Sequence, residues 1–119
     1  MNKLLICGGL LGLLAVFMGA TLDHFVTLSD AETASVMVGI RYNMLYALLI
    51  AAIGLAPTKQ YLQLSGAIFA IGTCLFSISI YLTHLTPLKQ LVYLVPFGGV
   101  TIMLAWVLLI MTGVKWRTA

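Results

Sequence analysis

The chain has 119 residues, of which 62% are hydrophobic and only 8% are charged. Soluble proteins carry about 25% charged residues, so a water-soluble fold is excluded because too few polar side chains exist to cover its surface. The formal net charge of +3 comes without a basic run. This pattern argues against a nucleic-acid partner, because in membrane proteins a few basic residues set the orientation instead.

Four apolar segments predict four transmembrane helices, at about residues 3–22, 38–56, 61–83 and 91–112. Each is about 19–23 residues long, enough to cross a ~30 Å hydrocarbon core as a helix. None shows the alternation of a barrel strand. We therefore expect an all-α polytopic membrane protein, with residues 1–119 forming a single four-transmembrane-helix domain whose first span is not cleaved off.

The first connection holds all three acids of the chain, Asp23, Asp30 and Glu32. Ser29 and Glu32 fit an S-x-x-E capping box, which predicts that the second helix begins near Asp30. The positive end of that helix stabilises Asp30 and Glu32. Two of the three acids are thus explained by local structure.

The basic residues predict the orientation. The side that holds both termini carries Lys3, Lys59, Lys115 and Arg117. The other side carries Lys89 and Arg41 together with the three acids. The positive-inside bias therefore places both termini in the cytoplasm, in a multi-pass protein of the cell inner membrane.

Arg41 lies a few residues inside the second span, and two explanations are open for it. It can extend its long side chain to the interface, or it can pair with an acid, for which Asp23 at the end of the first span is the best placed partner.

Further polar groups are expected at a similar depth. Pro96 is expected to break the fourth helix and free the Val92 carbonyl, which neighbouring polar groups would then satisfy. These groups are either hydrogen-bonding links between helices or the lining of an outward-facing polar site. The candidate ligand-binding residues are Asp23, His24, Arg41, Asn43, Tyr46, Ser77, Tyr81, Pro96, Gly98 and Gly99.

No catalytic residue, metal site or cofactor is predicted. Cys7 and Cys74 are isolated within apolar segments, which favours packing between helices over a disulfide. No nucleophile and base occur at a useful spacing. Small residues at Gly8-x-x-x-Gly12, Ala15-x-x-x-Gly19 and Gly66-x-x-x-Ala70 predict close helix packing within the bundle or between copies of the chain.

Four further motifs stand out, one for each predicted span: Gly19-Ala20-Thr21-Leu22-Asp23-His24, Tyr42-Asn43-Met44-Leu45-Tyr46, Leu75-Phe76-Ser77-Ile78-Ser79-Ile80-Tyr81, and Val95-Pro96-Phe97-Gly98-Gly99 followed by Ala105-Trp106. Together they resemble the motifs of the YgdD-like family of small bacterial inner-membrane proteins (domain of unknown function 423), which is related to eukaryotic transmembrane protein 256. The family has a histidine where this chain has Tyr46, and an alanine in place of Asp23. The resemblance implies a four-helix membrane protein and no established activity.

Two functions are compatible with the sequence. The first is a non-enzymatic membrane component that binds a lipid, a small polar ligand or a protein partner through the outward-facing polar residues. The alternative is a small proton- or cation-coupled transporter acting as an oligomer, although no acid lies in the middle of a predicted span, where proton coupling normally needs one. The expected partners are membrane lipids, a second copy of the chain or another membrane protein.

Overall fold

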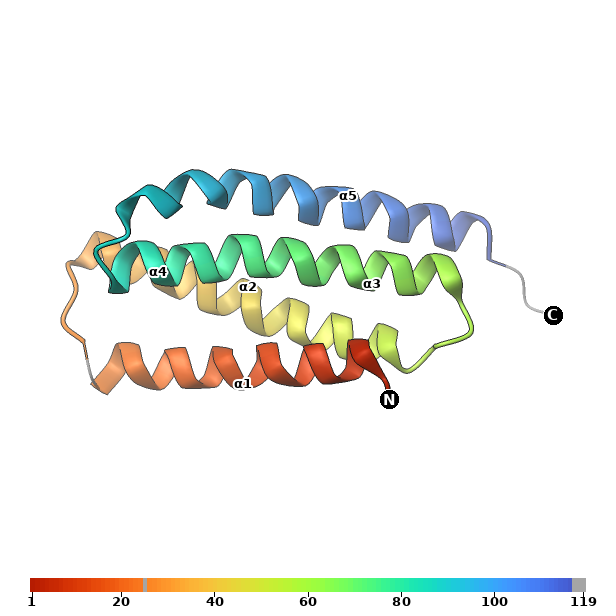
Figure 1. Ribbon diagram of the computed structural model, residues 1–119, viewed down its shortest axis with the longest axis horizontal. Coiled ribbons are helices and arrows are strands. Elements are labelled where there is room, and N and C mark those ends of the chain that lie inside the picture. Colours follow the sequence, from red (N-terminus) through yellow and green to blue (C-terminus); the bar gives the residue numbers. More distant parts are fainter. Residues whose placement is uncertain (25, 117–119) are drawn as a thin grey trace.

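The computed structural model describes residues 1–24 and 26–116, and every regular element in that part of the chain is helical (Figure 1). The helices α1 (Lys3–His24) and α2 (Asp30–Gly54) come first. They are followed by α3 (Gln60–Thr73), the π-helix η1 (Cys74–Ile78) and α4 (Ser79–Leu85), which run on as one rod. The 3-10 helix η2 (Lys89–Leu94) then leads into α5 (Val95–Val114).

Four helical rods are long and apolar enough to cross a membrane. They are Lys3–His24, Asp30–Gly54, Gln60–Leu85 and Lys89–Val114, with mean hydropathies between 1.8 and 2.3. Large apolar side chains such as Leu13, Phe17 and Leu48 cover the outside of the bundle and are more than 60% exposed. Such a surface suits lipid and not water, which confirms the predicted all-α membrane fold.

The bundle consists of two helical hairpins. In the first, α1 packs along α2, and in the second, α3 packs along α5, while α2 and α3 join the two hairpins. The N-terminus, the α2–α3 turn and the C-terminal end of α5 lie together at one end of the bundle, called the terminal end below (Figure 1). The loop end holds residues 26–29 and 86–88 (Figure 1).

Small residues let the helices approach closely within each hairpin. A Cβ added at Gly8 would lie 2.8 Å from the Ala47 carbonyl oxygen and 2.8 Å from the Ala51 nitrogen. One added at Gly72 would lie 2.7 Å from the side chain of Ile102. Gly8 therefore allows close packing within the bundle, which is one of the two alternatives predicted for the small residues.

The predicted capping box is confirmed at the start of α2. The Ser29 hydroxyl accepts a hydrogen bond from the Glu32 amide (3.2 Å) and donates one to the Glu32 carboxylate (3.0 Å). The other carboxylate oxygen of Glu32 lies 3.8 Å from Nδ1 of His84 on α4. Glu32 thus also contacts the second hairpin at the loop end.

The prediction that Pro96 breaks the fourth helix and frees the Val92 carbonyl is wrong. Pro96 is the second residue of α5, within the first turn of a helix, where proline is tolerated. The Val92 carbonyl is not free, because it accepts from the Val95 amide at the end of η2. The chain therefore changes from a 3-10 helix to an α-helix here, so no α-helix is interrupted.

Candidate functional site

A layer of buried polar contacts joins α2 to the α3–η1–α4 rod. Asn43 Nδ2 donates to the Tyr81 hydroxyl (2.8 Å), and the Ser77 hydroxyl donates to the Gly39 carbonyl (2.9 Å). Asn43 and Ser77 are fully buried and Tyr81 is 4% exposed. These three predicted site residues are thus brought together, but they lie between helices and bond to one another or to backbone.

The π-helix η1 lies at the centre of this layer, because Ser77 belongs to it. A π turn inserts an extra residue into a helix and is frequent at functional positions. Two buried polar atoms nearby, Asn43 Oδ1 and Thr73 Oγ1, have no hydrogen-bond partner within residues 1–24 and 26–116. Polar atoms left unpaired away from water are costly, so this layer carries more polarity than helix packing needs.

An open groove lies beside the layer, between α2 and α5. Its volume is about 430 Å³. The described residues that line it carry no formal charge, and they are Tyr42, Tyr46, Phe76, Pro96, Gly99, Val100, Ile102, Met103 and Trp106. The groove is therefore an apolar and aromatic recess in the surface that faces the membrane.

Aromatic rings in edge and stacked contact form much of the groove. The ring centroids of Tyr42 and Phe76 are 5.4 Å apart, and those of Tyr46 and Trp106 are 6.1 Å apart. Behind them, Phe69 stacks on Tyr46 at 5.4 Å and meets Trp106 edge-on at 5.0 Å. Such contacts stabilise beyond the buried area alone, so these ring contacts support the inner wall of the groove.

One hydrogen bond spans the groove floor. The indole N–H of Trp106 on α5 donates to the hydroxyl of Tyr46 on α2 (3.0 Å). Tyr46 is 6% exposed, whereas Trp106 and Tyr42 remain 40% and 39% exposed. The buried tyrosine therefore anchors the floor, and the two exposed rings are available to a ligand.

The predicted residues near the loop end are not part of the buried layer. Asp23 and His24 form the end of α1, and both are exposed, as is Arg41. Of the two explanations left open for Arg41, the ion pair with Asp23 is not found, because the described residues contain no ion pair between these two side chains. Arg41 follows the start of α2 by 11 residues (41 − 30), which places it about 16 Å along the helix, well below the end of α1.

The three predicted residues of α5 have different places. Pro96 and Gly99 line the groove, while Gly98 is buried against the rod. A Cβ at Gly98 would lie 2.4 Å from the backbone nitrogen of Phe76. Gly98 therefore allows α5 to lie close to η1, whereas Pro96 and Gly99 line the groove.

Of the nine described residues that line the groove, only Tyr46, Pro96 and Gly99 were among the predicted site residues. The other six were missed, and they are Tyr42, Phe76, Val100, Ile102, Met103 and Trp106. The available signal was the i, i+4, i+7 spacing of Gly99, Met103 and Trp106, which puts them on one face of a helix. That face could not be assigned to a groove without knowing that α2 and α5 stay apart.

The groove can hold a molecule but offers little chemistry to act on it. Its described lining contains no acid, base, thiol or aliphatic hydroxyl, and the only ionisable groups are tyrosine phenols. No group of three or more His, Cys, Asp or Glu residues within the described part of the chain could hold a metal ion. The arrangement favours binding of an apolar molecule by packing.

Comparison with known proteins gives a family but no activity. The chain is 26% identical to the UPF0382 inner membrane protein YgdD of Escherichia coli (strain K12) over 94% of this chain and 89% of that protein. It is 27% identical to the UPF0382 membrane protein YwdK of Bacillus subtilis (strain 168), over 98% and 99% of the two chains.

A UPF0382 membrane protein of Haemophilus influenzae is 28% identical over 89% of both chains. No solved structure matches. The model of the family described as "Protein of unknown function (DUF423)" matches residues 18–99, which include the polar layer and the loop-end part of the groove. The chain therefore belongs to the DUF423 family of membrane proteins.

Proposed function

We propose that this membrane protein is a non-catalytic component that holds one acyl chain of a membrane lipid in the groove between α2 and α5. The observation that carries the proposal is the groove itself. It is uncharged along its described lining, walled by the rings of Tyr42, Phe76 and Trp106, and open on the surface that faces lipid.

An acyl chain is the occupant that this chemistry favours. Lipid tails surround the bundle at very high concentration, so even weak binding fills the groove. Apolar burial gives little driving force there, because the tail leaves an equally apolar medium. Affinity therefore comes from dispersion contacts and shape, which rigid aromatic rings provide better than flexible side chains.

The buried polar layer supports the groove. The bonds from Asn43 to Tyr81 and from Ser77 to the Gly39 carbonyl fix α2 against the rod. The bond from Trp106 to Tyr46 fixes α5 relative to α2. In this proposal the polar residues hold the groove open at a constant width, and Arg41 extends to the headgroup region, where it can meet the lipid phosphate.

The test blocks the groove with a larger side chain on one of its lining residues. A Cβ at Gly99 meets no described atom within 4 Å, so Gly99→Leu places a side chain in the groove without a backbone clash. Gly113 is equally open but lies outside the groove, so Gly113→Leu is the matched control. Both variants are purified in nanodiscs that contain phosphatidylethanolamine with a diazirine on one acyl chain.

After photolysis, mass spectrometry of peptides measures the crosslinks. We expect labelling of Met103 and Trp106 in the unmodified protein and in Gly113→Leu, and at least a fivefold loss in Gly99→Leu. Labelling that is spread evenly over all lipid-facing helices, or that survives Gly99→Leu, would refute the groove as an acyl-chain site.

We also propose that the terminal end of the bundle faces the cytoplasm. Lys3, Lys59 and Lys115 lie there, and basic residues favour the cytoplasmic side. Arg117, the fourth basic residue of the prediction, lies outside the described residues. Alkaline phosphatase fused after Leu28 is expected to be active, whereas a fusion after Lys59 is expected to be inactive. The reverse pattern of activity would overturn the orientation.

A further inference from the structure

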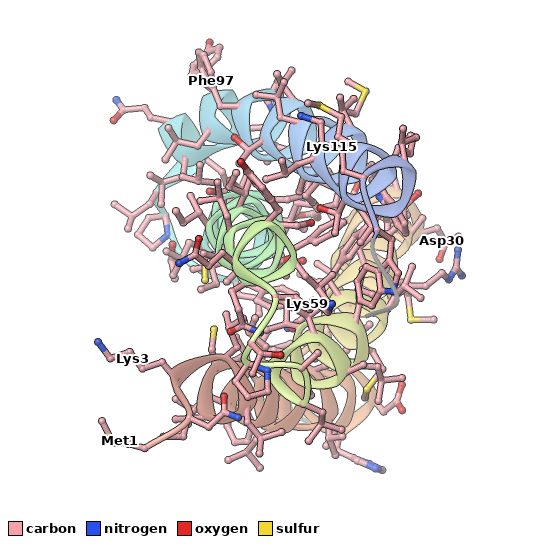
Figure 2. The ribbon with its side chains drawn as sticks, turned by 90° about the vertical axis from the view of Figure 1, so that its right-hand side faces the viewer. Met1, Lys3, Asp30, Lys59, Phe97 and Lys115 are labelled. Atoms are coloured by element: carbon pink, nitrogen blue, oxygen red, sulfur yellow. The ribbon has the colours of Figure 1, made fainter. Side chains whose placement is uncertain are left out.

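A second hollow lies at the terminal end, where the start of α3 meets the end of α5. Its volume is about 380 Å³. Its lining includes Lys59, Tyr61, Thr112, Lys115 and Trp116, and it shares no residue with the groove between α2 and α5. Figure 2 looks along the bundle at this end, with Lys59 of the turn and Lys115 just after α5 both labelled.

The two lysines are held by aromatic rings from opposite sides of the hollow. Nζ of Lys59, on the turn before α3, lies 4.4 Å from the ring centroid of Trp116, which follows α5. Nζ of Lys115, beyond the end of α5, lies 6.0 Å from the ring centroid of Tyr61 on α3. Cations are attracted to the faces of aromatic rings, so these two contacts hold both ammonium groups at the hollow.

The charged side chains in the described lining of the hollow are basic. Its described lining contains two lysines and no acid. The acids of the chain, Asp23, Asp30 and Glu32, lie at or near the loop end, at the far ends of α1 and α2. The positive end of the α3 dipole adds to the field of the lysines, because Gln60 begins that helix.

We propose that this hollow binds the phosphate of an anionic phospholipid headgroup. Lysine ammonium groups bind phosphate as point charges. Tyr61 and Trp116 are of the types that lie at headgroup level in membrane proteins, and both are exposed here. The lysines therefore meet the phosphate, and the ring edges and Leu62 meet the glycerol and the first carbons of the chains.

The experiment measures lipid binding by native mass spectrometry of the full-length protein in detergent. Phosphatidylglycerol is titrated against phosphatidylcholine for the unmodified protein and for Lys59→Gln/Lys115→Gln. One lysine near an anionic lipid surface contributes about fivefold in affinity, so the loss of both is expected to weaken phosphatidylglycerol binding about 30-fold. Phosphatidylcholine binding should change less than twofold.

Two controls separate the hollow from the general positive charge. Lys3→Gln removes a charge at the same end but outside the hollow, and it should reduce the affinity less than threefold. Lys59→Arg/Lys115→Arg keeps the charge and should restore the preference for phosphatidylglycerol. Thermal unfolding of each variant shows that it is folded.

A third arm adds inorganic phosphate as a competitor. Failure of millimolar phosphate to displace phosphatidylglycerol supports a lipid headgroup, whereas phosphate binding without a preference for phosphatidylglycerol would assign the hollow to a free anion and overturn the lipid. An equal loss in Lys3→Gln and in the double variant would overturn the hollow as a site. Because the groove variant Gly99→Leu leaves these lysines untouched, the two proposals can fail separately.

Discussion

Replacing Gly98 by alanine is expected to force α5 away from the rod that it packs on. The added Cβ would lie 2.4 Å from the Phe76 nitrogen, 2.8 Å from Phe76 Cα and 2.9 Å from the Gly72 carbonyl oxygen. All three atoms belong to backbone, so no side chain can rotate away. Restoring an ordinary contact at 3.4 Å requires a local separation of about 1 Å (3.4 − 2.4), which disrupts neighbouring contacts in a close-packed interface.

The expected cost follows from two opposing terms. Forcing an extra carbon into a packed interface costs about 1–3 kcal/mol. Alanine gains up to about 1 kcal/mol over glycine in helix propensity. The adjacent Gly99 isolates the first term, because a Cβ there meets no described atom within 4 Å and Gly99→Ala receives the propensity gain alone.

The assay is unfolding of both variants in mild detergent by titration with sodium dodecyl sulfate, followed by circular dichroism. Gly99→Ala should be as stable as the unmodified protein or slightly more stable. Gly98→Ala should be less stable than Gly99→Ala by about 1–3 kcal/mol. Equal stability of the two alanine variants would refute the close approach of α5 to η1.

Three further predictions test other contacts by the same unfolding assay. Gly8→Ala should destabilise the α1–α2 hairpin by about 1–3 kcal/mol whereas Gly9→Ala, where a Cβ meets no described atom within 4 Å, should not; equal effects would contradict the packing of α1 on α2. A double-mutant cycle of Asn43→Ala and Tyr81→Phe should show a coupling of about 1 kcal/mol through their buried hydrogen bond, and strict additivity would argue against that bond. Ser29→Ala should cost about 1 kcal/mol by removing the cap of α2, and an unchanged stability would mean that the cap contributes nothing.

The candidate site was predictable only in part. Asn43, Ser77 and Tyr81 stood out because polar side chains are rare in apolar spans and usually pair between helices. Their partners were not predictable, since the Gly39 carbonyl has no sequence signal as an acceptor. The suggested Asp23–Arg41 ion pair is not found, because the sequence shows opposite charges in neighbouring helices but not how deep in the membrane each side chain lies.

The sequence by itself determined that the chain is a membrane protein of four helices. Apolar segments without the alternation of barrel strands must bond their backbone polar groups within a helix, and the thickness of the hydrocarbon core sets the helix length. The sequence also determined where α2 begins, since the cap formed by Ser29 and Glu32 is a local interaction. Only the tertiary structure decided that α2 and α5 leave a groove between them, and that Gly98 packs on backbone while Gly99 remains open. Both outcomes depend on how helices distant in sequence pack against one another, and an apolar residue has the same sequence pattern whether it faces lipid, a groove or another helix.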